Sequence, residues 1–137
     1  MACCDHENLV RFVAVCQTQP PKLITEFLPR GDALRYVRRR RDQLSSKQLL
    51  SWCHQISDGM AYLSEYKEGT KLVHRDLAAR NILVKNPNHV KIADFGLAQV
   101  GEFYGYIDVG NVCWRRNVLM TLLHNEKSHQ HLKPVTI

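Results

Sequence analysis

The chain has 137 residues, of which 45% are hydrophobic and 23% charged, with seven glycines and five prolines. That length suits one domain, and the composition is that of an ordinary globular protein, which excludes a collagen-like, low-complexity or wholly disordered chain. No run reaches the roughly eighteen consecutive apolar residues of a membrane span, and residues 1–6 lack the basic and apolar regions of a signal peptide. We therefore expect a cytoplasmic chain without a membrane segment.

Basic residues exceed acidic residues, 19 against 13, which gives a formal net charge of +6. Four of the positive charges form one run, Arg38 to Arg41. Such a run is either a solvated helix face or a patch for nuclear localisation or phosphate binding, and both interpretations stay open. A local run does not by itself predict nucleic acid as a partner, and none is expected. The five cysteines show no C-x-x-C spacing, so we expect reduced thiols rather than disulfides or a zinc site.

Two strands and a short helix are expected near the start of the chain. An apolar run rich in β-branched residues over 8–16 predicts a buried strand, and residues 23–27 predict a second one. The short turn between them implies antiparallel pairing. Residues 32–41 then favour a short helix, with Leu34 and Val37 facing inward and the arginines outward.

The clearest helix pattern begins near residue 46. Apolar residues spaced by four, three, four and three positions share one helical face: Leu49, Cys53, Ile56, Met60 and Leu63. Ser45, with Gln48 three positions later, fits a capping box at the start of this helix.

Short strands follow the helix. They are expected at 72–73, 82–84 and 90–92. The turn residues at 86–88, which read N-P-N, predict a hairpin between the last two strands.

Two motifs on either side of this hairpin carry the chemistry of phosphoryl transfer. His74 to Asn81 reads H-R-D-L-A-A-R-N, and Asp94 to Gly96 reads D-F-G. In phosphoryl transfer a carboxylate orients the attacking hydroxyl, while an amide oxygen and a second carboxylate hold metal ions on the phosphates. Asn81 lies five residues after Asp76, as in the motif H-R-D-L-x-x-x-N. Either motif alone is weak, but the two in this order, with a strand, a turn and a strand between them, are specific.

These motifs resemble those of protein kinases of the tyrosine-specific type. Serine/threonine kinases usually place a lysine two residues after the catalytic aspartate, whereas here Ala78 stands at that position and the basic residue is Arg80. The D-L-A-A-R-N form resembles receptor tyrosine kinases, and the flanking segments resemble the epidermal growth factor receptor group over about residues 1–100. The resemblance implies an α+β fold that is a partial protein-kinase-like fold. It would comprise the last strands of the upper lobe, the hinge, and the first helices and catalytic loop of the lower lobe.

The resemblance also implies ATP and Mg²⁺ as cofactors, a tyrosine of a protein as the substrate, and a kinase domain as a conceivable partner. It makes Asp76 the catalytic base, Arg80 an aid in placing the substrate tyrosine, and Asn81 and Asp94 the Mg²⁺ ligands. The residues that it assigns to ATP binding are the gatekeeper Thr25, the hinge residues Glu26, Phe27 and Leu28, the ribose contact Asp32, the pocket floor Leu83, and Asp94. The residues that it assigns to the structure of the site are His74, Arg75, Phe95 and Gly96, with His74 and Phe95 stacked on each other.

Parts of the kinase pattern do not occur in the sequence. No G-x-G-x-x-G loop precedes the first two strands, since the first glycine, Gly31, comes after them. No V-A-I-K lysine precedes these strands either. We therefore expect residues 1–100 to be a partial kinase domain, running from the end of the helix C region through D-F-G. Residues 101–137, which contain no A-P-E motif, are expected to be an unmatched and poorly ordered tail.

Three functions stay open on these grounds. The chain is a tyrosine kinase polypeptide, a non-catalytic interaction module derived from a kinase, or a truncated product without a function. As a fragment, it is expected to lack independent activity. If it belongs to a receptor, it would lie on the cytoplasmic side of a membrane.

Overall fold

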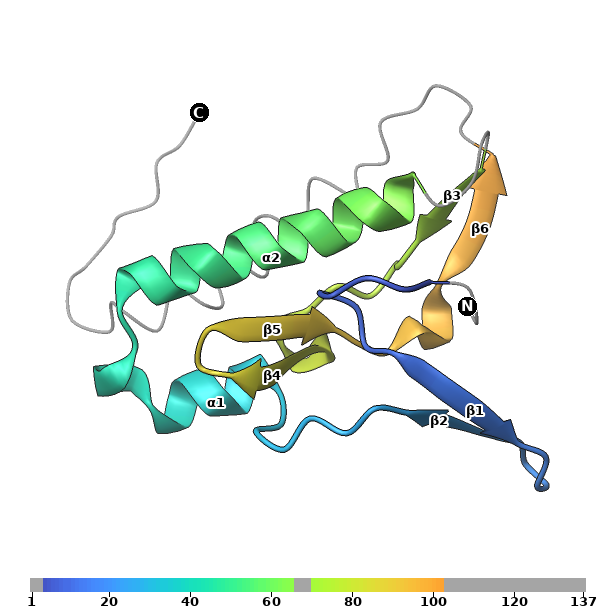
Figure 1. Cartoon of the computed structure of the whole chain (residues 1–137), viewed down its shortest axis with the longest axis horizontal. Coiled ribbons are helices and arrows are strands. Elements are labelled where there is room, and N and C mark those ends of the chain that lie inside the picture. Colours follow the sequence, from blue (N-terminus) through green and yellow to red (C-terminus); the bar gives the residue numbers. More distant parts are fainter. Residues whose placement is uncertain (1–3, 66–69, 103–137) are drawn as a thin grey trace, which may run out of the picture.

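The computed structural model describes residues 4–65 and 70–102. The helices and strands in chain order are β1 (Phe12–Cys16), β2 (Lys22–Thr25), α1 (Ala33–Arg39), η1 (Arg41–Gln43), α2 (Ser46–Ser64), β3 (Thr70–Val73), η2 (Ala79–Asn81), β4 (Ile82–Asn86), β5 (His89–Ile92), η3 (Phe95–Leu97) and β6 (Gln99–Glu102). Within this part of the chain the strands form three two-stranded antiparallel sheets, β1–β2, β3–β6 and β4–β5 (Figure 1). Two helices and small antiparallel sheets fit the expected partial kinase-like fold.

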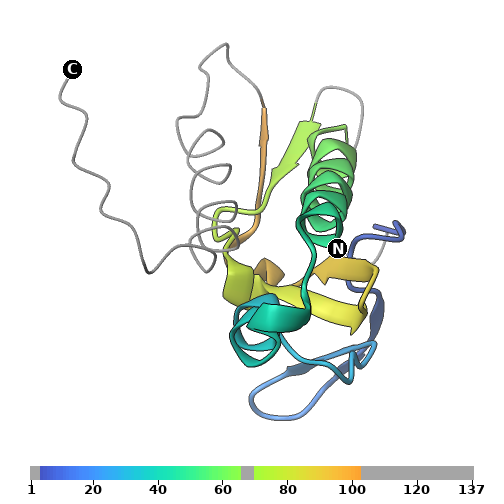
Figure 2. The ribbon, with the colours of Figure 1, turned by 90° about the vertical axis from the view of Figure 1, so that its left-hand side faces the viewer.

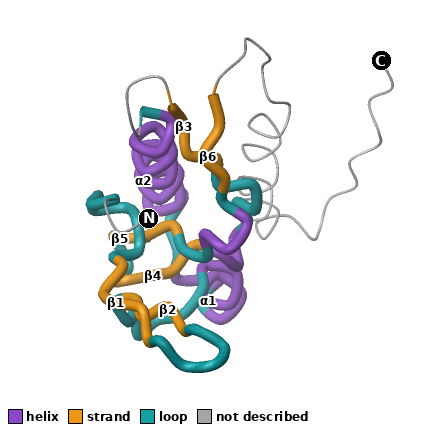
Figure 3. The backbone as a smooth tube through the Cα atoms, turned by 90° about the vertical axis from the view of Figure 1, so that its right-hand side faces the viewer, coloured by secondary structure: helices purple, strands orange, loops and turns teal. Residues whose placement is uncertain are grey.

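The β4–β5 hairpin is the middle layer of the molecule. Figure 2 and Figure 3 show it between α2 on one side and α1 with the β1–β2 ribbon on the other. The buried core is formed by the segment before β1, α1, α2, β3 and the β4–β5 hairpin, and no residue of β1 or β2 belongs to it: Leu9, Ala33, Tyr36, Val37, Leu49, Trp52, Ile56, Leu63, Leu72, Ile82, Val84, Val90 and Ile92. Because α2 packs on β5 and α1 packs on β4, the apolar residues Ile82, Val84, Val90 and Ile92 are all buried, whereas Lys85 and Asn86 near the turn are exposed.

Helix α2 forms where the apolar spacing predicts it. Leu49, Ile56 and Leu63 of the predicted face are buried, and Trp52 and Gly59 join them. The predicted capping box forms only in part. The Ser45 hydroxyl accepts a hydrogen bond from the Gln48 amide at 3.2 Å, but the Gln48 side chain does not return this contact, since it donates to a carbonyl of the hairpin turn. Among the residues that the structure describes, no helix has the length and apolar character needed to cross a bilayer.

The turn between β4 and β5 is fastened to α2 by side-chain hydrogen bonds. The Pro87 carbonyl accepts bonds from Gln48 Nε2 and, at 3.0 Å, from Trp52 Nε1. Gln55 donates to the Asn88 carbonyl at 2.8 Å and accepts from the Val90 amide at 2.9 Å. The predicted hairpin is therefore confirmed, and polar side chains of α2 fix its position.

The apolar run at residues 8–16 splits into two parts. Strand β1 covers only its second half, and Leu9 forms a parallel bridge to Ile92 of β5. The Ile92 amide donates to the Asn8 carbonyl at 2.8 Å, and the Val10 amide donates to the Ile92 carbonyl at 2.8 Å. The prediction of one continuous strand is therefore wrong, because the first residues of the run pair with β5 instead.

The predicted burial of the second half of this run is also wrong. Val13 and Val15 of β1 are 56% and 52% exposed. The predicted antiparallel pairing with β2 is confirmed, but β2 ends at Thr25, two residues earlier than predicted. A two-stranded ribbon leaves both faces open unless another layer packs on it, and in the described part of the chain no further strand joins β1–β2.

Helix α1 is short and capped at its start. The Asp32 carboxylate accepts a hydrogen bond from the Arg35 amide at 2.9 Å, which satisfies one of the free amides of the first turn. Val37 is buried as predicted, whereas Leu34 is half-buried and Tyr36 takes its place in the core.

Strand β6, which the sequence pattern does not predict, pairs with β3 in a register that places Lys71 opposite Gly101 and Leu72 opposite Val100. The strand therefore crosses the expected domain boundary at residue 100. Residues 103–137, and with them the rest of the predicted tail, lie outside the described residues.

Gly59 lies where α2 meets both β5 and the N-terminal segment. A Cβ atom at this position would lie 3.0 Å from Ile92 Cδ1 and 3.2 Å from both the Asn8 carbonyl oxygen and Leu9 Cδ2. The helix would gain about 1 kcal/mol from an alanine, but overpacking costs about 1–3 kcal/mol when the neighbours cannot move. Asn8 is held by its backbone bond to β5, so overpacking should dominate.

We expect Gly59→Ala to lower the free energy of unfolding of the 137-residue chain by about 1 kcal/mol, measured by urea titration. The matched control is Ser57→Ala, an exposed position on the same helix, which should leave stability unchanged or raise it by up to about 0.5 kcal/mol. Equal effects of the two substitutions would contradict the close packing at Gly59.

Candidate active site

The three predicted catalytic residues form one hydrogen-bonded group. The Asp76 carboxylate accepts a bond from Arg80 Nη2 at 2.6 Å through one oxygen and from Asn81 Nδ2 at 2.9 Å through the other. Asn81 Nδ2 also donates to the Asp76 carbonyl at 2.8 Å. Arg80 and Asn81 belong to η2, so a single helical turn brings both side chains back onto the aspartate.

These bonds set the charge of Asp76. The hydrogen bond from Arg80 is the main cause that lowers the pKa of the Asp76 carboxyl, and the bond from Asn81 lowers it further. Partial burial acts in the opposite direction but does not prevail. The group is therefore ionised at neutral pH. A carboxylate with a lowered pKa is a weak base, so it is better suited to accept and align a hydroxyl than to remove its proton early.

The backbone of Ala93 joins the catalytic loop to the D-F-G segment. Its amide donates to the Asn81 carbonyl at 2.8 Å, and its carbonyl is 2.9 Å from His74 Nε2. Asp94 is the next residue along the chain. The two motifs, which are separated by the whole hairpin in sequence, are therefore held side by side by two bonds to one residue.

His74 is completely buried between these two segments. Its Nδ1 faces the Asp76 amide at 3.3 Å. Because an amide can only donate, Nδ1 is the acceptor and Nε2 carries the proton that bonds to the Ala93 carbonyl. The His74 and Phe95 rings lie 4.9 Å apart between centroids, so the predicted contact between them is present.

Two residues of the site have left-handed backbone conformations, which residues other than glycine rarely adopt. They are Arg75, with φ of 66°, and Asp94, with φ of 60°. Arg75 Nη1 donates to Gln99 Oε1 of β6 at 2.7 Å. One Asp94 carboxylate oxygen accepts a bond from the Gly96 amide at 3.3 Å, at the start of η3. The side chain of each residue is thus anchored by a hydrogen bond to the segment that follows D-F-G or to D-F-G itself.

The oxygen atoms present fit Mg²⁺. Both partners of Asn81 Nδ2 are acceptors, so the amide nitrogen faces Asp76 and the amide oxygen is left for a cation. Asp94 adds an exposed carboxylate. The described residues contain no group of three or more His, Cys, Asp or Glu side chains that could hold a metal ion by themselves. One carboxylate and one amide suit Mg²⁺, which keeps several waters and takes its remaining ligands from phosphates.

Most of the residues predicted to bind ATP lie at the end of β2 and between β2 and α1, whereas Leu83 lies on β4 and Asp94 directly precedes η3. Asp32 forms an antiparallel bridge with Leu83 of β4, and the Val84 amide donates to the Gly31 carbonyl at 2.9 Å. The predicted ribose contact and pocket floor are therefore neighbours. The Asp32 carboxylate is also 3.4 Å from the Arg35 guanidinium, so any ligand would compete with that ion pair.

The predicted gatekeeper and the predicted hinge residues differ in their surroundings. Leu28 is buried, whereas Thr25 is exposed and Phe27 is 87% exposed. The Glu26 carboxylate accepts bonds from Lys91 Nζ of β5 and from the amide of Arg11, the residue before β1. Burial alone would raise the pKa of Glu26, but the bonds to Lys91 and Arg11 outweigh it and lower the pKa. The side chains of Thr25 and Phe27 are thus not brought to the catalytic group by any contact among the described residues.

Three contributions to the site could not be found from the sequence pattern. Ala93 acts through its backbone, Gln99 lies on an unpredicted strand, and Lys91 is buried although lysine usually lies on the surface. The position of Ala93 directly before D-F-G is the one signal that points to it.

Comparison with known proteins agrees with this geometry. The family model of protein tyrosine and serine/threonine kinases matches residues 1–112. The chain is 53% identical over 102 residues to receptor tyrosine-protein kinase erbB-4 of Homo sapiens, covering 74% of the chain and 8% of the relative. It is 54% identical over 100 residues to the epidermal growth factor receptor of Apis mellifera, covering 73% and 7%. It is 49% identical over 133 residues to the melanoma receptor tyrosine-protein kinase of Xiphophorus maculatus, covering 95% and 11%.

The chain therefore belongs to the protein tyrosine kinase family. Its homologues are receptor tyrosine kinases of the epidermal growth factor receptor and ErbB group, which are about 50% identical to it in sequence over most of the chain. The chain spans only about a tenth of the length of these relatives. Both the family match and the last alignment continue past residue 100, and a domain boundary at that residue stays a prediction.

The buried His74 makes stability depend on pH. Burial lowers the pKa of His74 below its ordinary value of 6.5. Between the lowered value and 6.5 the unfolded chain binds a proton that the folded chain does not, so the free energy of unfolding rises with pH in that range. Stability contributed by the neutral ring is complete above 6.5 and is lost as the pH falls.

We expect the free energy of unfolding of the chain to fall between pH 7.5 and pH 5.5, measured by urea titration. His74→Gln, which keeps a donor for the Ala93 carbonyl but does not titrate, should be less stable than the parent at pH 7.5 and should lose less on acidification. An unchanged pH dependence in this variant would show that other groups cause it.

Proposed function

We propose that the group around Asp76 is the catalytic loop of an ATP-dependent protein tyrosine kinase site, which transfers the γ-phosphoryl group of ATP to a protein tyrosine. The observation that carries the proposal is the pair of bonds from Ala93 to Asn81 and His74. These bonds hold the segment that leads into Asp94 against the loop that carries Asp76, the aspartate that would align the attacking hydroxyl. Homology to receptor tyrosine kinases supports the same reaction and an origin on the cytoplasmic side of a membrane.

Each residue has a role in this proposal. The Asp76 carboxylate accepts a hydrogen bond from the substrate hydroxyl and aligns it with the phosphorus atom. Arg80 holds that carboxylate in place and contacts the incoming tyrosine. Asn81 and Asp94 would hold Mg²⁺, which when bound compensates the charge on the phosphate oxygens. Ala78 leaves room where a lysine would otherwise project.

The segment between β2 and α1 would receive the nucleotide. The backbone of residues 26–28 would bond to the adenine edge, Asp32 would bond to the ribose, and Leu83 would cover one face of the base. The buried Leu28 and the bonds of residues 31 and 32 to β4 support this arrangement, since they hold the segment against the hairpin.

The 137 residues supply only part of such a site, because the sequence contains neither the glycine-rich loop nor the V-A-I-K lysine. We infer that the chain by itself is not an active kinase. The exposed apolar side chains of β1 and β2, namely Val13, Val15, Leu23 and Ile24, support a second candidate function. In that case the chain acts as a kinase-derived module that pairs with another kinase segment.

We expect the 137-residue chain to bind Mg-ATP with a dissociation constant above about 1 mM in isothermal titration calorimetry, because the phosphates lack their lysine and their backbone cover. The control is a chimera that adds the glycine-rich loop, the V-A-I-K segment and the segment after D-F-G from the Homo sapiens relative. It should bind Mg-ATP in the micromolar range. Sub-millimolar binding by the chain alone would contradict the inference.

In the same chimera, Asp76→Asn should lower the turnover of tyrosine phosphorylation by about 10²–10⁴-fold. The affinity for ATP should change little, because Asp76 contacts no phosphate in this proposal. The matched control is Asp42→Asn, at an exposed aspartate on η1, which should keep full turnover. Retained activity of Asp76→Asn would refute the role given to Asp76.

A further inference from the structure

Nearly all of the net charge of the chain lies in one short segment. Six arginines and one aspartate occur in residues 30–41, so this segment carries +5 of the total of +6. We call these arginines the arginine face: Arg30, Arg35, Arg38, Arg39, Arg40 and Arg41. The remainder of the chain is close to neutral, and the charge distribution is therefore strongly one-sided.

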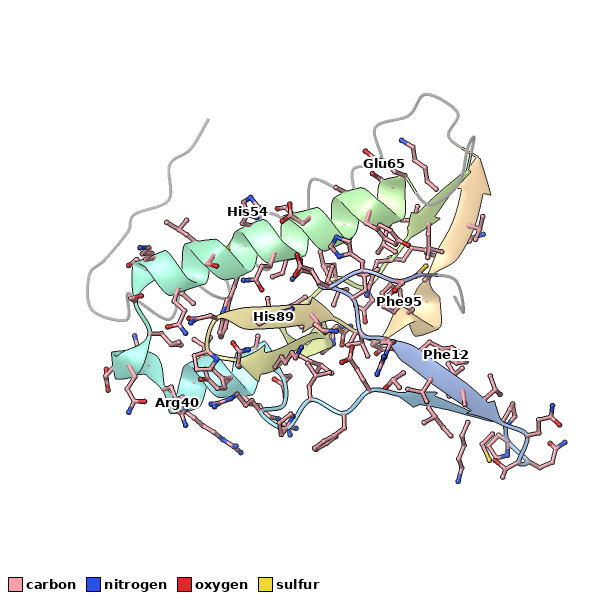
Figure 4. All side chains as sticks on the ribbon, viewed as in Figure 1. Phe12, Arg40, His54, Glu65, His89 and Phe95 are labelled. Carbon is pink, nitrogen blue, oxygen red and sulfur yellow. The ribbon has the colours of Figure 1, made fainter. Side chains whose placement is uncertain are left out.

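The fold presents the arginine face to solvent. Helix α1 turns Ala33, Tyr36 and Val37 into the core, which leaves Arg38 and Arg39 on its outer side. All six arginines are exposed. Figure 4 shows Arg40, at the end of α1, on the outer edge of the molecule and well apart from Phe95 of the candidate active site. The proposed reaction assigns no role to any of the six arginines.

The arginines are only partly neutralised by the chain itself. Arg35 pairs with Asp32 at 3.4 Å, and the Arg40 guanidinium lies 5.3 Å from the centre of the Tyr36 ring. Arg30, Arg38 and Arg39 make no ion pair or side-chain hydrogen bond with the described residues. Guanidinium groups without an internal partner are suited to binding phosphate groups, since each presents several donors in one plane.

An exposed aromatic side chain precedes this basic surface. Phe27 is 87% exposed and lies three residues before Arg30. Basic residues combined with an exposed phenylalanine are typical of surfaces that rest on a lipid bilayer, where the ring enters the boundary between headgroups and acyl chains. A single-stranded nucleic acid would instead require a basic groove that follows its backbone, whereas this surface is the outer side of a helix.

We propose that the arginine face binds the surface of a bilayer that contains anionic phospholipids, with Phe27 entering the headgroup region. Each basic residue near such a surface strengthens binding by about fivefold, and the effect falls off within the screening length of the salt. The proposal does not depend on phosphoryl transfer. It assigns to the arginine run a ligand class, which the sequence pattern leaves open.

The test is sedimentation of the 137-residue chain with vesicles. One set contains phosphatidylcholine alone and the other contains 30% phosphatidylserine. The chain should bind the second set, should not bind the first, and should be released by 1 M NaCl. Arg38→Gln with Arg39→Gln should weaken binding by about 25-fold, because two charges are removed while polar side chains that can donate hydrogen bonds are kept.

The matched control is Lys47→Gln with Lys85→Gln, which removes the same charge from exposed positions outside the arginine face. This control should keep binding within about twofold. Phe27→Ala, like the arginine pair, should weaken binding to the phosphatidylserine vesicles at low salt. Circular dichroism of each variant establishes that α1 and α2 remain folded.

Three results would overturn the proposal. The first is no binding to the phosphatidylserine vesicles, and the second is an equal loss in the arginine pair and the lysine pair, which would mean that only net charge matters. The third is binding of a single-stranded RNA oligonucleotide that is tighter than binding to the vesicles and is lost in the arginine variant. That result would assign the surface to nucleic acid instead.

Discussion

The candidate site depends on the two hydrogen bonds made by the backbone of Ala93. One bond fixes the loop that carries Asp76, and the other fixes the buried ring of His74. Because both bonds use backbone atoms of a buried residue, they are protected from competition with water, which makes them more durable than surface bonds. The next residue, Asp94, has a left-handed backbone conformation, with φ of 60°.

The position of Ala93 depends in turn on β5, the strand that ends one residue before it. This strand is paired with β4 on one edge and with the Asn8–Val10 segment on the other, and Gln55 of α2 bonds to the Val90 amide. Helix α2 can approach so closely because residue 59 has no side chain. A chain of packing contacts thus runs from the helix to the metal-ligand candidates without including any residue that carries chemistry.

Local rules account for the elements that were predicted correctly. The spacing of Leu49, Ile56 and Leu63, and the N-P-N turn, act within a few residues and need no knowledge of the fold. The predictions failed where a distant segment decides the outcome. Gln48 prefers the Pro87 carbonyl to its own capping box, Asn8 pairs with a strand about eighty residues away, and Gln99 joins a strand because β3 offers it an edge. The motifs predicted the residues of the site, but not the backbone that brings them together.

The pairing of Asn8 with Ile92 also constrains the order in which the chain can fold. During synthesis the N-terminal residues leave the ribosome first, yet the strand that covers Leu9 is made more than eighty residues later. Closing so long a loop is entropically costly and slow compared with forming a helix. Until β5 emerges, Leu9 and Val10 lack the strand with which they pair in the described fold, whereas β1 can already pair with β2. Leu9, which is buried in the finished fold, therefore stays exposed during most of synthesis, and such exposed apolar surface is what chaperones bind.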